Sequence, residues 1–136
     1  MSTSEAMTQR QLARVRKIAL ALPEVTERLS HGAPTFCFRD KRPICYFHAA
    51  SFAADGRMSV WCPAEVGAQQ DLVATEPERF FAPTPSASGV FRDWIGVYLD
   101  TSGEHAVDWN EVGQIIRDAY RLVAPKRLAL GLDGDE

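Results

Sequence analysis

The sequence predicts an α+β domain in which helices cover a central antiparallel sheet. Three observations lead to this prediction. Amphipathic helical patterns stand near both ends of the chain, several short alternating segments follow one another between them, and polar turns separate those segments. Consecutive strands favour an antiparallel sheet, whereas a Rossmann-like fold alternates strands with helices. The expected order of elements is α-β-β-β-α-β-α.

The composition fits a single domain. The chain has 136 residues, of which 46% are hydrophobic and 24% are charged, and these values are ordinary for a globular protein. The longest uninterrupted apolar run covers only residues 18–22, whereas a membrane helix needs about 20 residues. We therefore expect one domain over residues 1–128, no association with a membrane, and a flexible acidic tail over residues 129–136.

The first helix is expected from Thr8 to Leu22. Its apolar residues recur at helical spacing, namely Leu12, Val15, Ala19 and Leu22. Pro23 ends the helix, and Thr8 with Gln11 matches a capping box. A second face of this helix is basic and carries Arg10, Arg14 and Lys17. We interpret that face either as a solvated surface or as a contact for a phosphate or a partner.

A hairpin is expected after a connector over residues 24–34. Residues 35–39 and 44–48 alternate like strands, and the polar segment between them favours a turn. If Asp40 and Lys41 are the turn residues, Phe36, Phe38, Cys45 and Phe47 share one face and Cys37 lies on the other. A slip of one residue reverses this arrangement.

The middle of the chain is expected to contain two strands with a helix between them. Residues 58–62 form the third strand, and a second helix follows over residues 64–75. Residues 76–81 are expected to form a helical turn that brings two aromatic residues to the core. A loop rich in Pro and Ser then leads to extended structure over residues 89–100, with a further short strand over residues 89–92 as an alternative.

The last helix is the clearest element. Asp108 is expected to cap it, with Glu111 at the reciprocal capping position, and Pro125 ends it. A broad apolar stripe is predicted to face the sheet and consists of Val112, Ile115, Ile116, Ala119, Leu122 and Val123.

The cysteines and the first residues indicate a cytoplasmic protein. Cys37, Cys45 and Cys62 form an odd set without a CxxC motif, which argues against a disulfide framework. Each lies in an apolar, strand-like segment, so we expect buried, unpaired thiols. Residues 1–10 are polar and lack the apolar core of a signal peptide.

The charge distribution is uneven. The net charge is −3, but residues 1–42 carry eight Lys and Arg against four acidic residues. A protein that is dedicated to nucleic-acid binding is commonly strongly basic. The overall balance therefore gives no support to that function, and the basic N-terminal part gives a little.

No motif of an enzyme or a metal site occurs. HExxH, CxxC, P-loop, GxSxG and GxGxxG patterns are all missing, and the histidines lack ligand spacing. We expect neither cofactor nor metal and favour a binding module over an enzyme. A pocket near His31, Tyr46 and Trp94 would suit a small molecule, and Trp94 would stack a base if it lay on an exposed sheet face. His48 is expected to share a face with Tyr46.

Several segments together resemble the MmcQ/YjbR family. They run in order from residue 10 to residue 128 and comprise 21–24 (ALPE), 30–36 (SHGAPTF), Lys41, 78–81 (ERFF), 93–100 (DWIGVYLD), 108–109 (DW) and 119–128 (AYRLVAPKRL). The resemblance implies an α+β fold with a central antiparallel sheet, similar to type III secretion chaperones. It also implies DNA binding through a double-wing motif, without catalytic residues or a cofactor.

The two wings would be the hairpin tip at residues 39–43 and the loop around residues 89–93. The resemblance thus suggests four residues that bind DNA: Arg39, Lys41, Arg42 and Arg92. Three functions remain open from the sequence. They are a DNA-binding module, a protein-interaction or chaperone-like domain that uses an exposed sheet face, and a small-molecule binder with a pocket near His31.

Overall fold

A six-stranded antiparallel sheet in the order β1-β2-β3-β4-β6-β5 forms the centre of the molecule. The computed structural model describes residues 3–51, 53, 55–83 and 91–128. The strands are β1 (Val25–Ser30), β2 (Ala33–Phe38), β3 (Arg42–His48), β4 (Ser59–Cys62), β5 (Phe80–Phe81) and β6 (Ile95–Tyr98). The helices are α1 (Thr3–Leu20), α2 (Ala68–Thr75), the 3-10 helix η1 (Gly103–His105) and α3 (Trp109–Val123). The predicted α+β class is confirmed.

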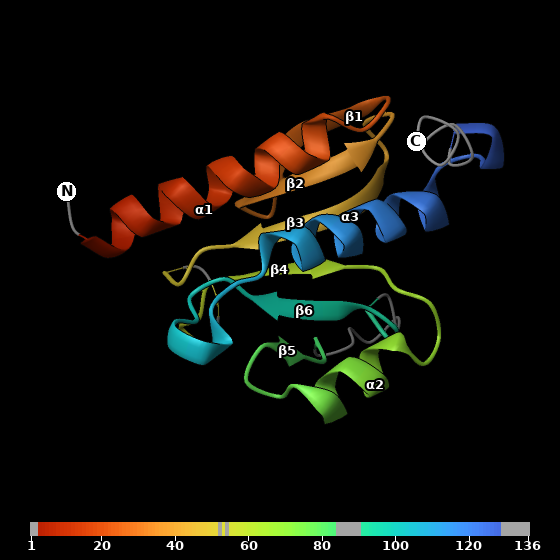
Figure 1. Cartoon of the computed structure of the whole chain (residues 1–136). Coiled ribbons are helices and arrows are strands. Elements are labelled where there is room, and N and C mark those ends of the chain that lie inside the picture. The colour runs from red at the N-terminus through yellow and green to blue at the C-terminus, as the bar shows by residue number, and fades with distance from the viewer. Residues whose placement is uncertain (1–2, 52, 54, 84–90, 129–136) are drawn as a thin grey trace.

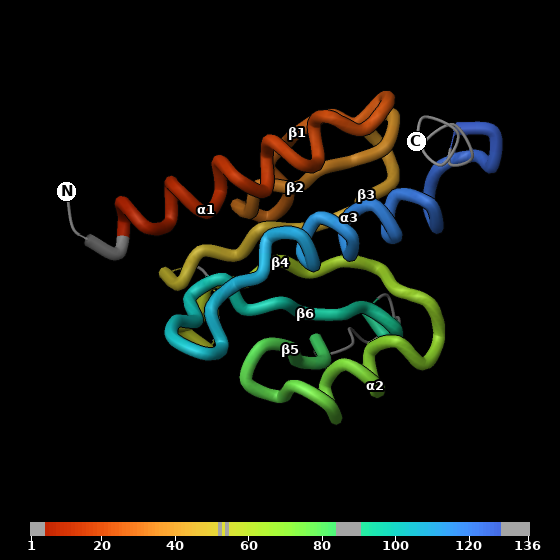
Figure 2. Tube along the Cα trace, in the orientation of Figure 1, coloured from red at the N-terminus to blue at the C-terminus, as the bar shows by residue number. Residues whose placement is uncertain are grey.

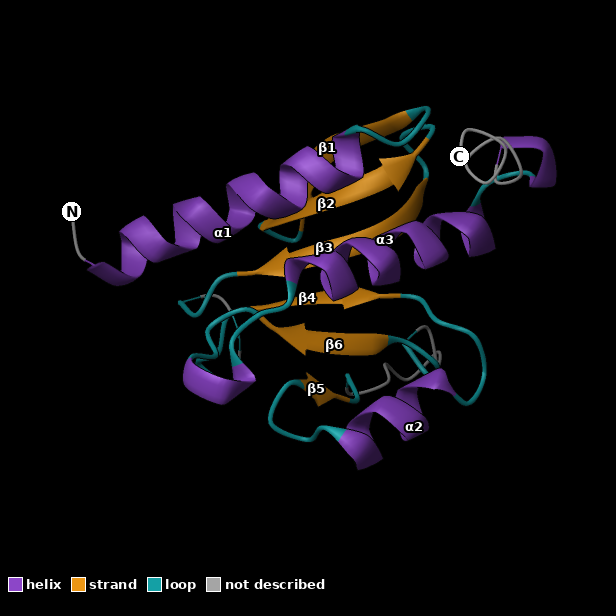
Figure 3. Cartoon of the chain, in the orientation of Figure 1, coloured by secondary structure: helices purple, strands orange, loops and turns teal. Residues whose placement is uncertain are grey.

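Helices α1 and α3 lie side by side across one face of the sheet, and α2 lies beside the edge strand β5 (Figure 1). Figure 3 shows the same arrangement by element type, with the arrows of β3 and β6 pointing the same way. Because β3 and β6 both pair antiparallel with β4, they begin at the same end of the sheet. In the described part of the chain, no helix is both long and apolar enough to span a bilayer.

The hydrophobic core lies between this helical layer and the sheet. Its largest fully buried side chains are Tyr120, Phe36, Phe47, Phe80, Ile44, Ile95, Leu99 and Ile116. Alternate strand positions supply the core, because successive side chains of a strand point to opposite faces. Val60 and Cys62 of β4 belong to the core, for example, whereas Trp61 between them does not. The strand residues that alternate with these core positions, such as Trp61, therefore lie on the other face of the sheet.

The prediction that residues 24–34 form only a connector is wrong, because strand β1 lies within this range. Only Val25 of this strand is buried, and the side chain of Leu29 is 72% exposed. An edge strand with one buried residue lacks the apolar alternation on which the prediction depended. The strand is held instead by continuous pairing with β2, from Val25 opposite Phe38 to Ser30 opposite Ala33.

The predicted hairpin is confirmed, with a local change near its turn. Phe36 lies opposite Cys45 as the Asp40–Lys41 turn requires, but the register shifts after Phe36. Ile44 is the extra residue, and both Ile44 and Cys45 enter the core, which is the effect of a β-bulge. The shift leaves a turn over residues 39–41, in which Arg39 and Asp40 have φ angles of 51° and 60°.

Two helix starts and the segment before β5 differ from the predictions. Helix α1 already includes Thr3, so Thr8 does not cap it, and Gln11 instead donates from Nε2 to the Leu99 carbonyl at 2.9 Å. Helix α2 begins at Ala68, four residues later than predicted from residue 64. Residues 80–81 form β5 rather than a helical turn. Part of the alternative strand at 89–92, and the whole tail 129–136, lie outside the described residues.

Helix α3 begins as predicted, and its buried face is partly different. The Asp108 side chain accepts hydrogen bonds from the backbone N–H groups of Asn110 and Glu111. Leu122 is 43% exposed, so the predicted stripe is wrong at that position. Tyr120, which the stripe omitted, is fully buried and donates its hydroxyl to the Pro23 carbonyl at 3.0 Å. A phenol that reaches a backbone acceptor is buried as readily as an apolar side chain.

Candidate functional site

Ring-bearing side chains cover the sheet face that lies opposite α1 and α3. We call this surface the aromatic face and define it by Tyr46, His48, Trp61, Phe81, Phe91, Trp94 and Tyr98. The strand residues among them occupy the positions that alternate with core residues, and Tyr46 of β3 pairs directly with Trp61 of β4. The turn before β6 adds the remaining two rings, which lie against this pair.

The rings form one continuous set of contacts. The ring centroids of His48 and Trp61 are 4.3 Å apart, and those of Phe91 and Trp94 are 4.9 Å apart, both with edge-to-face geometry. The rings of Phe81 and Tyr98 stack at 4.6 Å. Every residue of the aromatic face is half-buried, in contrast to the fully buried rings of the core. Part of the aromatic surface therefore remains open to solvent.

Arginines border the aromatic face. The Arg57 guanidinium lies 3.7 Å from the ring centroid of Tyr98 and binds the Asp100 carboxylate at 2.7 Å. Arg92 is exposed, and in the sequence it lies between Phe91 and Trp94. Arg28 of β1 lies opposite Thr35 of β2, which lies opposite Tyr46 of β3, so Arg28 belongs to the same face of the sheet as Tyr46.

Burial controls the ionisation of groups on this face. It raises the pKa of Tyr46, which therefore stays a neutral phenol. It lowers the pKa of His48, against a weaker opposing effect of Asp55, so this imidazole is neutral at pH 7. Burial also raises the pKa of the Cys37 thiol, although Arg28 opposes it. At pH 7 the face thus offers neutral rings, among them a phenol and an imidazole that can form hydrogen bonds.

The hairpin tip carries three of the four residues that the family resemblance suggested. Arg39 binds Glu24 in a bidentate ion pair, with Nε to Oε1 at 2.9 Å and Nη2 to Oε2 at 3.2 Å. Figure 2 traces this turn next to the segment that joins α1 to β1, where Glu24 lies. Lys41 and Arg42 are exposed and form no ion pair within the described part of the chain. The tip therefore presents two cations without a carboxylate partner and one with a partner.

Arg92, the fourth residue, is positioned by α2 rather than by the hairpin. The Gln69 amide donates from Nε2 to the carbonyl oxygens of Arg92 and Trp94, at 3.2 Å and 2.5 Å. Because β3 and β6 both pair antiparallel with β4, the turn before β6, which carries Arg92, and the hairpin tip before β3 lie at the same end of the sheet. Arg92 is exposed and lies in the same turn as Phe91, next to Trp94, and both of these rings belong to the aromatic face.

The pocket expected near His31 has a different arrangement. His31 is exposed in the turn between β1 and β2, with a φ angle of 53°. Tyr46 and Trp94 do lie together, with ring centroids 5.5 Å apart, and His48 shares their face as predicted. His31 lines neither of the two grooves described below.

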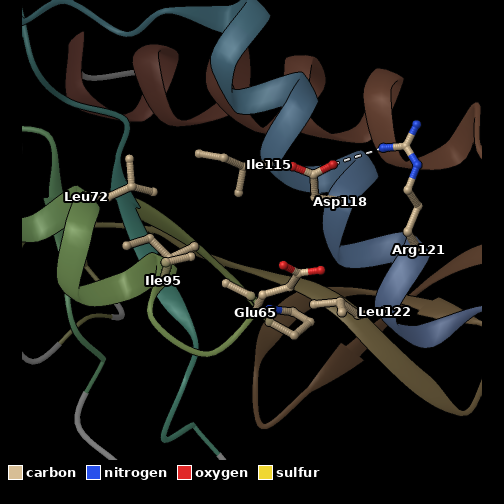
Figure 4. A pocket seen from close by; sticks show the side chains of 10 residues that line it. Glu65, Leu72, Ile95, Ile115, Asp118, Arg121 and Leu122 are labelled. Atoms are coloured by element: carbon tan, nitrogen blue, oxygen red, sulfur yellow. Dashed lines mark hydrogen bonds and ion pairs between the residues drawn. The ribbon is translucent and has the colours of Figure 1, made fainter.

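One groove of about 420 Å³ lies between α2 and α3. Figure 4 shows the side chains of Leu72, Ile95 and Ile115 at its apolar end. Asp118 and Arg121 bind each other at 2.9 Å, and Glu65 adds a second carboxylate. The arginine is thus already neutralised within the groove. The residues that the structure describes contain no group of three or more His, Cys, Asp or Glu suited to a metal ion.

The cysteines occupy no reactive position. All three are buried and unpaired, and Cys45 and Cys62 belong to the core. Burial, with the neighbouring Cys62 thiol, raises the pKa of Cys45 well above its ordinary value. A thiol that stays protonated is a poor nucleophile.

These features define an α+β domain with one helical face and one aromatic face. The family model YjbR matches residues 20–122, and the chain belongs to the YjbR family. The crystal structure of the Deinococcus radiodurans protein DR2400, which carries the domain DUF419, has a similar fold, with a TM-score of 0.62 and 18% sequence identity. The match covers 85% of this chain and 79% of that chain. The search of curated proteins found no match.

Proposed function

We propose that this domain is a non-enzymatic module that binds single-stranded nucleic acid on its aromatic face. The observation that supports this function is the row of half-buried rings that extends across β3, β4, β6 and β5. Bases stack on aromatic side chains with about 1–3 kcal/mol each, and sheets with exposed aromatic residues bind single strands in this way. Tyr46, Trp61 and Trp94 are the residues on which we expect bases to stack.

The four cations suggested by the family resemblance complete the proposal. A single strand needs positive charge along its backbone. Arg92 lies in the turn that leads to Trp94. Lys41, in the turn before β3, and Arg42, the first residue of β3, lie at the same end of the sheet. Arg39 joins them once Glu24 releases it. With only three or four phosphate contacts, we expect weak binding, with a slope of log affinity against log salt of about −2 to −3.

The test is a titration of a labelled oligonucleotide, read by fluorescence anisotropy at about 50 mM salt. A dT oligonucleotide and a duplex of equal length are compared. The single strand should bind more tightly, and Trp94→Ala should weaken its binding about tenfold, because one stacking contact is worth about 1–3 kcal/mol. Leu122→Ala is the control, since Leu122 lies on α3, is 43% exposed and lies outside the aromatic face.

The wing variant separates two modes of nucleic-acid binding. The triple change Arg39→Ala, Lys41→Ala and Arg42→Ala should reduce the salt dependence but leave part of the single-strand affinity. If duplex binds as well as single strand and the triple change abolishes both, a double-wing mode replaces the aromatic one. If the wild type shows no salt-dependent binding to either, the domain is not a nucleic-acid binder.

A second candidate function, protein interaction, is favoured by β1. This strand forms one edge of the sheet, and Leu29 on it is 72% exposed. An open edge strand is a template for pairing with another strand. Sedimentation velocity over a concentration series tests the simplest form, pairing between two copies, which Leu29→Lys should abolish. A wild type that stays monomeric at every concentration contradicts this form.

A further inference from the structure

A second groove lies on the helical side of the molecule, between α1 and α3. Its volume is about 520 Å³, within the range of small-ligand sites. Arg14 and Lys17 of α1 line one side, and Trp109 and Arg117 of α3 line the other. The two helices run next to each other in front of the sheet (Figure 1), whereas the aromatic face lies behind it. The groove is therefore separate from the surface proposed above.

The charge of this groove is one-sided. Arg14, Lys17 and Arg117 line it without any carboxylate. Five other arginines of the domain bind acidic residues, namely Arg16, Arg39, Arg57, Arg79 and Arg121. Within the described residues, no carboxylate lies within ion-pair distance of the three groove cations. Three neighbouring positive charges without a counterion attract an anion of more than one charge.

Most of the remaining lining is apolar, with Asn110 as a polar exception. Trp109 is half-buried, and the Arg14 guanidinium lies 5.3 Å from its ring centroid. Ile18 and Leu22 continue the apolar surface along α1. Gly113 leaves space beside Arg117, since a Cβ atom there would lie 3.2 Å from Nη1. The groove thus combines an aromatic wall with guanidinium groups, which bind phosphate oxygens in bidentate fashion.

We propose that the groove between α1 and α3 binds a nucleoside di- or triphosphate, with the phosphates on Arg14, Lys17 and Arg117 and the base against Trp109. The three cations match the charge of two or three phosphates. The volume accommodates a ligand with a ring system, and Ile18 and Trp109 offer apolar area to the base. This site also accounts for the basic face of the first helix that the sequence shows, except for Arg10, which does not line the groove.

Isothermal titration calorimetry with ATP tests the proposal, with adenosine and inorganic pyrophosphate as partial ligands. We expect saturable binding of one ATP per chain with a Kd of about 1 mM or tighter. Adenosine alone should not bind, and pyrophosphate should bind more weakly than ATP. The double change Arg14→Gln and Lys17→Gln should weaken ATP binding at least tenfold. Both side chains are exposed, so the fold is expected to remain intact.

Arg10→Gln is the matched control. It removes one cation from the same helix outside the groove and should leave the Kd for ATP within twofold. Equal weakening by Arg10→Gln would show nonspecific attraction to a basic helix and would overturn the site. Failure of ATP to bind would overturn it as well, as would pyrophosphate binding as tightly as ATP. Trp94→Ala, which tests the aromatic face, should leave ATP binding unchanged, so the two proposals fail separately.

Discussion

The ring of Phe81 occupies the space in which any side chain at position 96 would stand. Phe81 lies opposite Gly96 in the pairing of β5 with β6, and a Cβ atom built on Gly96 overlaps the ring carbons of Phe81. The same ring stacks on Tyr98 and meets the edge of Trp61. A glycine on β6 is therefore part of the arrangement of the aromatic face.

Gly96→Val is expected to destabilise the domain and to disturb the aromatic face. The side chain must displace Phe81, and overpacking of this kind costs about 1–3 kcal/mol. Urea denaturation measures the loss, and tryptophan fluorescence reports the environment of Trp61. The double variant Gly96→Val with Phe81→Ala should recover part of the stability, since the clash is then removed. An unchanged urea midpoint in Gly96→Val would contradict the close approach of these residues.

The two sides of α3 are expected to respond differently to truncation. Ile116 is fully buried, so Ile116→Ala should cost about 2–5 kcal/mol through lost contacts and a cavity. Leu122 is 43% exposed, and Leu122→Ala should change the unfolding free energy by only about 0.5 kcal/mol. Thermal melts of the two variants test the orientation of the helix. Equal losses would show that Leu122 is buried in solution.

The sequence predicts the fold where pattern and packing agree. The α3 cap at Asp108, the pairing of Phe36 with Cys45 and the burial of all three cysteines follow from spacing and alternation. Strand β1 does not, because an edge strand with one buried residue has no apolar period. The helical pattern places Leu122 in the core, because an apolar stripe does not show where the sheet beneath it ends.

The candidate site was only partly predictable for a similar reason. Alternation indicates that Tyr46 and His48 share a face, but the contacts with Trp94 and Phe91 depend on how a turn packs over the sheet. Phe81 joins them through β5, which the sequence presents as a helical turn. The resemblance to the family directs attention to cations in two loops. Aromatic residues at the non-core positions of three strands are the signal that would have indicated the face.

Asp100 is expected to make stability depend on acid pH. Burial would raise the pKa of Asp100, but hydrogen bonds and the charge of Arg57 outweigh burial and hold it below the ordinary value. Because the folded state holds this proton less tightly, its contribution is present above the unfolded pKa of about 3.9 and is lost as the pH falls through the folded pKa. Asp100→Asn should cost about 1 kcal/mol at pH 7, since the pair is partly exposed. Its cost should shrink towards pH 3 in urea titrations, and a constant cost would contradict the ion pair.

His48 is expected to weaken the fold as the pH falls through the neutral range. Burial lowers the pKa of His48, and its ring lies 4.3 Å from that of Trp61. An unfolded histidine has a pKa of about 6.5, so below this pH the unfolded state binds a proton that the folded state resists. The unfolding free energy should therefore decrease from about pH 6.5 down to the folded pKa and then level off.

His48→Phe keeps a ring against Trp61 and removes the titrating group, so its urea midpoint should fall less between pH 7.5 and pH 5.5. A wild type whose urea midpoint is equal at both pH values would show that the imidazole is solvated rather than buried among the rings of the aromatic face.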